Sequence, residues 1–314
     1  MRIVGFSRPV ALIAAFALLA GCGAATKKAS SGHVASPAVT RHTAAAGLKI
    51  SRAGSLPAAA SRVAAVALPD GRLMVLGGLI GGSSSTQILA GPPSKLTSIG
   101  QLPLATHDDA AVVLGRYVYL LGGGQATSND AVVRISADGS ATHTGSLGEP
   151  LSDLGAAVVG NTAYIAGGYT GTLYATGILA FRGGTPTLAA RLPVGLRYAG
   201  VAALGGRVYV AGGISSSATT DSVYVFDPQT KSVKKIATLP TPVAHAPLAA
   251  LGGFLYLIGG TGSRIVFRIA PGGGVTVVGH LPTVVANAAA VVLGSSIYVI
   301  GGDGSNAVLR LTPR

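Results

Sequence analysis

The chain has 314 residues, of which 47 are glycine and only 11% are charged, yet 49% are hydrophobic. This hydrophobic content argues against a disordered chain, and so much glycine disfavours a helix-rich protein, because each glycine inside a helix costs about 1 kcal/mol. The sequence contains no tryptophan and a single cysteine, and its formal net charge is +13.

Residues 1–22 have the features of an export signal. Arg2 and Arg8 form a basic start, and Val10–Leu19 form an apolar core that is too short to span a bilayer permanently. The segment ends in Leu-Ala-Gly-Cys22, which resembles a bacterial lipobox, whose cysteine is lipidated and becomes the new N-terminus. An ordinary signal peptide is the alternative. We predict an exported lipoprotein, anchored through Cys22 to the outer face of the cell membrane, or to the periplasmic side if the host has an outer membrane.

Residues 23–47 are rich in Ala, Ser, Thr and Gly and show no helical or strand period, which predicts a flexible tether. Because Cys22 is the only cysteine, the remaining chain can form no internal disulfide.

A repeat begins beyond the tether. Gly-Gly pairs that follow an apolar run recur at 77–78, 122–123, 167–168, 212–213, 259–260 and 301–302. A Leu-Pro marker lies about 20 residues before five of these pairs, and the third unit has the degenerate form Leu147-Gly-Glu-Pro150. Two markers in step through six units indicate six copies of one structural element.

Each unit resolves into four short strands separated by Gly, Asp and Pro turns. In the second unit we expect them at Asp109–Leu114, Tyr117–Leu121, Ala131–Ser136 and Thr142–Leu147. Four such strands cannot bury both faces of their sheet alone, whereas six units arranged radially can. The sequence therefore predicts an all-β fold, a six-bladed β-propeller of four-stranded blades.

The last unit ends at Arg314 after its third strand, Ala307–Thr312, and so lacks a fourth. The segment Leu48–Ser55 is an unassigned strand at the other end of the domain. We predict that this N-terminal strand completes the sixth blade and closes the ring, which also covers otherwise exposed strand edges.

The units resemble Kelch repeats, whose hallmark is a Gly-Gly pair at the end of the second strand. The best match is the fourth unit, RVYVAGGISSSATTDSVYVFDPQTKSVKKIATLP, with Tyr224 in its third strand. Kelch units usually carry a tryptophan in the fourth strand, where Val233 stands here, so these are divergent units. The resemblance covers residues 48–314 and implies a propeller that binds other molecules through loops around its central channel.

Candidate site residues come from counting back from each glycine pair. The positions fourteen and fifteen residues upstream hold a polar or ionisable side chain in every unit, just before an apolar first strand. Loops carried by a rigid scaffold are common functional sites. We therefore predict ligand-binding residues at the channel mouth, with solvated or mutually paired side chains as the alternative: Arg62, His107, Asp108, Asp153, Arg197, Tyr198, His245 and Asn287.

These observations predict a monomeric binding or scaffolding module at the cell surface, whose partner is an extracellular protein or a cell-wall glycan. An exported address argues against nucleic acid despite the basic charge. No metal-ligand spacing, phosphate loop or catalytic motif is present, and we predict no cofactor and no metal.

The Kelch resemblance also suggests two enzymes for comparison. Galactose oxidase needs a Cys–Tyr cross-link, which a chain with Cys22 alone cannot form. A six-bladed Kelch epimerase of sialic acid is the better analogy. It implies an alternative function on an anionic sugar, with Asp153 or His245 as general base and with Arg62 and Arg197 holding a carboxylate.

Overall fold

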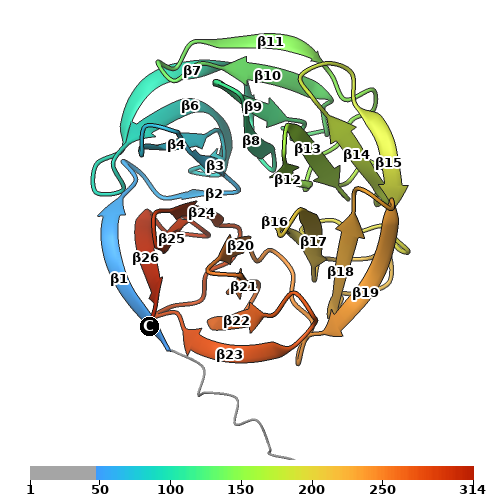
Figure 1. The fold of residues 1–314 in the computed structure, drawn as a ribbon. Coiled ribbons are helices and arrows are strands. Elements are labelled where there is room, and N and C mark those ends of the chain that lie inside the picture. Colours follow the sequence, from blue (N-terminus) through green and yellow to red (C-terminus); the bar gives the residue numbers. More distant parts are fainter. Residues whose placement is uncertain (1–46) are drawn as a thin grey trace, which may run out of the picture. The chain divides into compact units, whose positions relative to one another are not determined.

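The computed structural model describes residues 47–314, whose regular secondary structure is entirely β-strand (Figure 1). The predicted export signal, Cys22 and all but the last residue of the predicted tether lie outside the described residues. Within residues 47–314 no helix is long and apolar enough to cross a membrane.

Six antiparallel sheets stand around a central axis as the blades of a propeller (Figure 1). The inner strands of neighbouring blades contact one another in cyclic order, so the ring is closed. Blade 1 contains, from the axis outward, β3 (Ala64–Ala67), β4 (Leu73–Leu76), β6 (Ser83–Gly91) and β7 (Thr97–Thr106). In the same order, blade 2 contains β8 (Ala110–Leu114), β9 (Tyr117–Leu121), β10 (Ala131–Ile135) and β11 (Ala141–Ser146). Blade 3 contains β12 (Gly155–Val159), β13 (Thr162–Ala166), β14 (Gly177–Phe181) and β15 (Thr187–Arg191).

Blades 4 to 6 repeat this arrangement. Blade 4 contains β16 (Gly200–Leu204), β17 (Arg207–Ala211), β18 (Ser222–Asp227) and β19 (Ser232–Thr238). Blade 5 contains β20 (Leu248–Leu251), β21 (Phe254–Ile258), β22 (Ile265–Ile269) and β23 (Val275–His280). Blade 6 contains β24 (Ala289–Leu293), β25 (Ser296–Ile300), β26 (Ala307–Pro313) and β1 (Leu48–Ser55). Two short strands, β2 (Ala60–Ser61) and β5 (Leu79–Ile80), extend the first blade. The predicted fold class is confirmed, and the four strands expected in the second unit begin and end within one residue of the observed bounds.

The N-terminal strand closes the ring as predicted. β1 pairs antiparallel with β26, from Leu48 opposite Pro313 to Ser55 opposite Ala307, and forms the outer strand of blade 6. The N–H of Arg314 donates to the carbonyl of Gly47, which extends the pairing to the last residue. The two ends of the domain are therefore joined in one sheet.

The hydrophobic core is divided among the six contacts between blades. Each buried cluster combines residues from two neighbouring blades, and no cluster belongs to one blade alone. Between blades 2 and 3 the rings of Tyr119 and Phe181 pack edge to face, and Tyr164 and Phe226 do the same between blades 3 and 4. A blade buries its faces only against its neighbours, which is why the sequence needs six copies.

The glycine pairs form the joints between blades. In blade 4 the N–H of Gly213 donates to the carbonyl of Val243, which lies in the segment leading into blade 5, at 2.8 Å. Gly212 has a φ of +63°, and a Cβ on it would overlap the same carbonyl oxygen. The other five pairs make the equivalent hydrogen bond at 2.7–2.9 Å. Only glycine combines this positive φ with so close an approach of two backbones.

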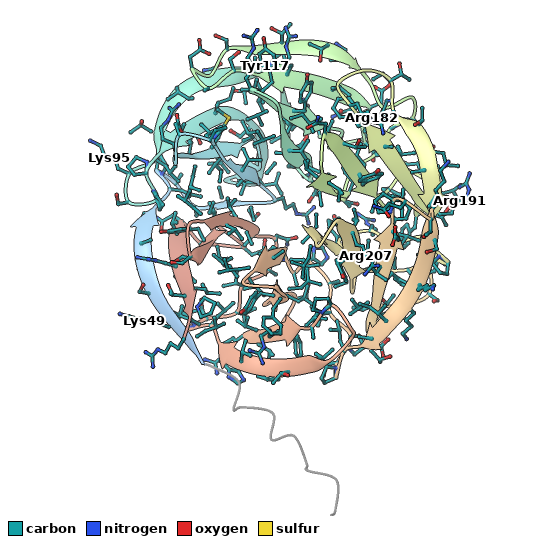
Figure 2. All side chains as sticks on the ribbon, in the orientation of Figure 1. Lys49, Lys95, Tyr117, Arg182, Arg191 and Arg207 are labelled. Atoms are coloured by element: carbon teal, nitrogen blue, oxygen red, sulfur yellow. The ribbon has the colours of Figure 1, made fainter. Side chains whose placement is uncertain are left out.

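Charged side chains are concentrated away from the axis. Lys49, Lys95 and Arg191 project from the outer rim of the ring in Figure 2. The channel itself is lined by apolar strands, so the ionisable groups at its mouth stand out against their surroundings.

Candidate functional site

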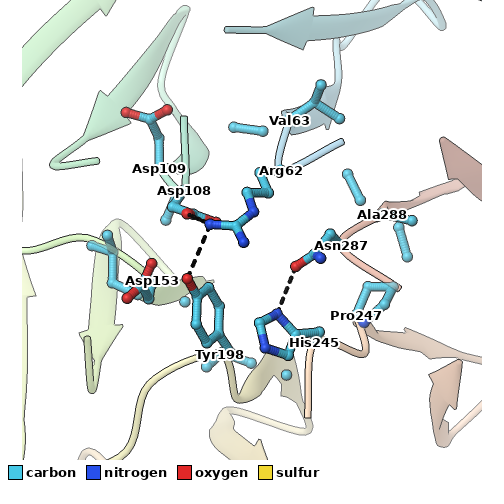
Figure 3. A pocket seen from close by; sticks show the side chains of 18 of the residues that line it. Arg62, Val63, Asp108, Asp109, Asp153, Tyr198, His245, Pro247, Asn287 and Ala288 are labelled. Carbon is cyan, nitrogen blue, oxygen red and sulfur yellow. Dashed lines mark hydrogen bonds and ion pairs between the residues drawn. The ribbon is translucent and has the colours of Figure 1, made fainter. Parts of the chain in front are cut away.

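Six side chains surround one end of the central channel, one from each blade. The residues of this mouth ring, in blade order, are Arg62, Asp108, Asp153, Tyr198, His245 and Asn287. All six have a left-handed backbone with φ between 55° and 59°, a conformation that costs a non-glycine residue roughly 1–2 kcal/mol. They line a central cavity of about 190 Å³ (Figure 3).

A closed circle of backbone hydrogen bonds supports this conformation. The N–H of each ring residue donates to the carbonyl of the ring residue in the preceding blade, and Arg62 closes the circle by donating to Asn287. The six bonds are 2.7–3.2 Å long. Because the backbone of every ring residue is held in this way, six side chains from six blades converge on one axis.

The alignment of the first unit was wrong by one position. Counting back from the glycine pairs placed Arg62 level with His107, whereas the structure places it level with Asp108. The turn between the first two strands of blade 1 is one residue longer, since Ala67 pairs with Leu73 where Val113 pairs with Val118 in blade 2. Val63 consequently lies behind the ring, in the core between blades 6 and 1.

His107 and Arg197 precede the ring residues of their blades and lie higher on the rim. Their backbones form bridges with Gly124 and Ile214, the residues that directly follow the glycine pairs. Both side chains line a second cavity, the rim cavity, of about 290 Å³ over blades 2 to 4. The structure thus brings all eight predicted residues to one mouth; ligand binding by them stays a prediction.

Two ion pairs occupy the mouth. Nη1 of Arg62 donates to Oδ2 of Asp108 at 2.7 Å, and Nη2 of Arg197 lies 2.5 Å from Oδ2 of Asp153. The carboxylates of both pairs are almost completely buried, with side-chain exposures of 8% and 2%. Because little solvent screens these pairs, both the attraction between the charges and the cost of removing them from water are larger than at the surface.

A tyrosine hydroxyl connects the two ion pairs. Nη2 of Arg197 donates to Oη of Tyr198 at 2.9 Å, and Nη1 of Arg62 donates to the same oxygen at 3.1 Å. Blades 1 and 4 stand on opposite sides of the ring, so the contact between Arg62 and Tyr198 crosses the channel (Figure 3). We call this contact between Arg62 and Tyr198 the crossbar. It divides the mouth into a charged half over blades 2 and 3 and an uncharged half over blades 5 and 6.

Aromatic rings fix the guanidinium of Arg197. Its Cζ lies 4.5 Å from the ring centroids of Tyr169 and Tyr198 and 5.6 Å from that of Tyr174. Cation–π contacts of this kind contribute about 0.5–2 kcal/mol each. Nε of Arg197 is buried and makes no hydrogen bond within residues 47–314. The side chain is therefore held by the contacts of Nη2 and by the contacts of the guanidinium with the tyrosine rings.

The uncharged half contains a hydrogen-bonded chain of three side chains. Nδ2 of Asn287 donates to both carboxylate oxygens of Asp303, at 2.9 and 3.1 Å, which turns Oδ1 of Asn287 toward His245. Nδ1 of His245 lies 2.6 Å from that oxygen. An amide oxygen only accepts, so the network assigns the proton to Nδ1 of His245 and leaves a lone pair on Nε2.

His245 is uncharged in this setting. Burial lowers the pKa of His245, and the nearby charge of Arg62 lowers it further, against the opposing effect of the hydrogen bond to Asn287. Its imidazole stacks on the ring of Tyr198 with centroids 3.8 Å apart. The stack and the hydrogen bond to Asn287 together fix the plane of the ring.

Burial raises the pKa of both mouth carboxyls. The pKa of Asp153 rises to about 6, because burial and the neighbouring charge of Asp108 outweigh the attraction of Arg197. Burial likewise raises the pKa of Asp108, which the charge of Arg62 opposes. Asp153 therefore takes up a proton near pH 6.

Asp109 has a structural role. Its carboxyl accepts a hydrogen bond from Oγ1 of Thr106 at 2.7 Å and packs against Gly123. Complete burial raises the pKa of Asp109 well above its usual range. The carboxyl points away from the central cavity in Figure 3.

Sequence reasoning missed Asp303. It directly follows a glycine pair, at the same position as Gly124 and Tyr169, whose backbones lie on the rim. Counting forward from the pairs as well as backward would have found it. Tyr169 and Tyr174 carry the other rim contacts, whereas Glu149, the only glutamate, lies exposed outside both cavities.

The channel below the ring has apolar walls. Two layers of side chains face the axis, and every member is alanine, valine or leucine. The layer nearer the mouth consists of Ala65, Ala111, Ala156, Val201, Leu248 and Ala290, and the next of Ala67, Val113, Val158, Ala203, Ala250 and Val292. Polar chemistry in the channel is therefore confined to the mouth. Residues 47–314 contain no cluster of three or more His, Cys, Asp or Glu side chains arranged to hold a metal ion.

Comparisons with known proteins agree with this architecture. A model of the Kelch motif matches residues 195–240, which span most of blade 4. The solved structure of YjhT superimposes with a TM-score of 0.69 over 82% of this chain and 95% of that chain, at 16% sequence identity. No curated protein matches the chain by sequence. The chain is therefore a six-bladed β-propeller that contains a Kelch motif.

Proposed function

We propose that this propeller is a binding module of the cell surface, and that the mouth ring and rim cavity form its ligand site. The observation that carries the proposal is the convergence of six polar side chains, one from each blade, on one cavity. Among them, Oδ2 of Asp153 is paired with Nη2 of Arg197, and Asp153 lines both cavities. A concave site in which a few polar groups converge over apolar walls is typical of ligand binding.

The proposed ligand is a glycan end or a polar side chain of a protein partner. Either ligand reaches the mouth from the face of the ring that carries the loops after the glycine pairs, because the cavities open on that face. Tyr169 and the guanidinium of Arg197 offer flat surfaces beside hydrogen-bonding groups, the combination that sugar rings and polar side chains use. Anchoring through Cys22 would hold the propeller at the cell envelope.

A thermal-shift screen of monosaccharides and short oligosaccharides tests the site. Asp153→Asn should abolish any shift, because it removes the charge that pairs with Arg197 where both residues line the rim cavity. Asp227→Asn is the matched control: Asp227 also pairs with an arginine, Arg207 at 3.0 Å, but it lies at the end of β18, away from both cavities. A shift that survives Asp153→Asn contradicts the site. Crosslinking on intact cells would identify a protein partner instead.

Anchoring is tested separately by metabolic labelling with a radioactive fatty acid. The full-length chain should carry label in the membrane fraction, and Cys22→Ala should carry none. An unlabelled chain that retains its N-terminal segment in the cytoplasm would contradict the predicted address without affecting the mouth.

A second candidate function is catalysis of proton transfer on a sugar. One observation favours it: an uncharged His245 with a free Nε2 shares the mouth with Asp153, a carboxyl that takes up a proton near pH 6. A base and an acid at one cavity can serve a single reaction. Adding the protein to sialic acid and following exchange of its anomers by proton NMR tests this function. A rate equal to the uncatalysed rate rejects that epimerase activity.

A further inference from the structure

The charge balance of the mouth bears on which ligands the proposed site accepts. Within the part of the chain that the structure describes, residues 47–314, Arg62 and Arg197 are the only lysine or arginine residues that line either cavity, and each already contacts a buried carboxylate. An anionic ligand would have to displace a carboxylate that the protein holds in place. Asp303 adds a further negative charge beside the uncharged half. The mouth therefore has no cation available for an anion.

One uncharged side chain of the mouth ring offers an acceptor without a partner. Nδ1 of His245 is bonded to Asn287, and Nε2 of His245 makes no hydrogen bond within residues 47–314. His245 lies in the uncharged half of the mouth, whereas both buried carboxylates lie in the charged half and are paired with arginines. A lone pair on an uncharged ring is complemented by a ligand with a hydroxyl donor.

Access to the mouth is unequal around the ring. The connections from the second to the third strand span residues 122–130, 167–176 and 212–221 in blades 2 to 4. In blades 5 and 6 they span only 259–264 and 301–306. The shorter connections lower the wall beside His245 and Asn287, so a ligand larger than one ring can extend out over these two blades.

We propose that the ligand is a neutral polyhydroxyl compound, of the class of uncharged sugars, and that Nε2 of His245 accepts a hydrogen bond from one of its hydroxyls. Asn287 and Asp303 are positioning residues that keep the imidazole in the required tautomer. This inference rests on the proposed function and specifies its ligand class. It replaces the anionic sugar that the two arginines had suggested.

Matched sugar pairs test the ligand class. Glucose with glucuronate and galactose with galacturonate differ only in a carboxylate that replaces a hydroxymethyl group. Calorimetric titration of the full chain should find binding of at least one neutral sugar, with its acid partner at least tenfold weaker. A uronate that binds as tightly as its neutral partner overturns the inference but leaves the proposed site in place. No binding by any of the four overturns the inference and leaves the proposed site to a protein partner, which the crosslinking identifies.

Nitrogen-15 NMR of the histidine side chains tests the positioning residues without any ligand. The wild-type signal of His245 should report a proton on Nδ1, and Asp303→Asn should give a mixture of tautomers and weaken neutral-sugar binding about five- to tenfold. The matched control is Asp221→Asn. Asp221 is an exposed carboxylate that lies 3.9 Å from Lys235 and lines neither cavity. A proton on Nε2 in the wild type, or equal effects of the two variants, overturns the role of His245.

Discussion

Gly212→Ala is the sharpest test of the joint between blades, because the chain contains a matched control. Gly212 and Gly205 have nearly the same backbone conformation, with φ of +63° and +58°. Alanine incurs the same left-handed cost at both, about 1–2 kcal/mol. A Cβ at Gly205 meets nothing within 4 Å, whereas one at Gly212 overlaps the carbonyl oxygen of Val243.

The overlap determines the difference between the two variants. The carbonyl of Val243 accepts the inter-blade hydrogen bond from Gly213. Moving it away loses that bond, worth about 1 kcal/mol, and leaves a buried donor and acceptor unpaired at about 1–3 kcal/mol. We therefore expect Gly212→Ala to lower the free energy of unfolding by roughly 3–6 kcal/mol. For Gly205→Ala we expect about 1–2 kcal/mol.

Guanidinium unfolding followed by far-UV circular dichroism measures both values. Gly205→Ala fixes the cost of the left-handed conformation alone, so only the difference between the variants reports on the joint. Equal midpoints and slopes for Gly212→Ala and Gly205→Ala would refute the reasoning, since the carbonyl would then have moved aside at no cost.

Three further predictions concern closure and the mouth. Deleting residues 48–56 removes the outer strand of blade 6 and should abolish cooperative unfolding; a melt like that of the full domain contradicts closure by β1. Because the pKa of Asp153 is raised to about 6, the folded chain holds this proton more tightly than the unfolded chain. Stability from this group is therefore greatest below about pH 4 and is lost as pH rises through 6, and Asp153→Asn should flatten that part of a stability–pH profile. Tyr198→Phe removes the hydroxyl that joins both ion pairs. In urea unfolding it should lower the free energy of unfolding by about 1–3 kcal/mol. Side-chain NMR of Arg62 should show increased mobility, and an unchanged Arg62 signal would count against the crossbar.

The fold was predictable because the recurring markers align the six units with one another. A glycine pair and a Leu-Pro marker recur in step, and short apolar strands lie between them at similar positions in each unit. In that alignment the last unit lacks a fourth strand and Leu48–Ser55 is a strand without a unit. The N-terminal strand is therefore the natural candidate for the missing position. The Cys22 prediction depends on residues outside this repeat and is tested only by labelling.

The composition of the mouth was predictable but its connections were not. Alignment identified the blades that supply an arginine, a carboxylate or a histidine, apart from the one-residue shift at Arg62 caused by the longer turn of blade 1. It could not tell that Arg62 crosses the channel to Tyr198, or that both arginines are already paired. Those contacts join residues from different blades, so they follow from how the ring closes.

By itself, the sequence determined that six similar units of four strands must stack around an axis, because a single unit cannot bury both of its faces. Only the tertiary structure decided what the mouth can bind. Six backbones held in a circle of hydrogen bonds bring side chains that lie about 45 positions apart to one cavity. Their charges then cancel in pairs, and Nε2 of His245 is left as an uncharged acceptor.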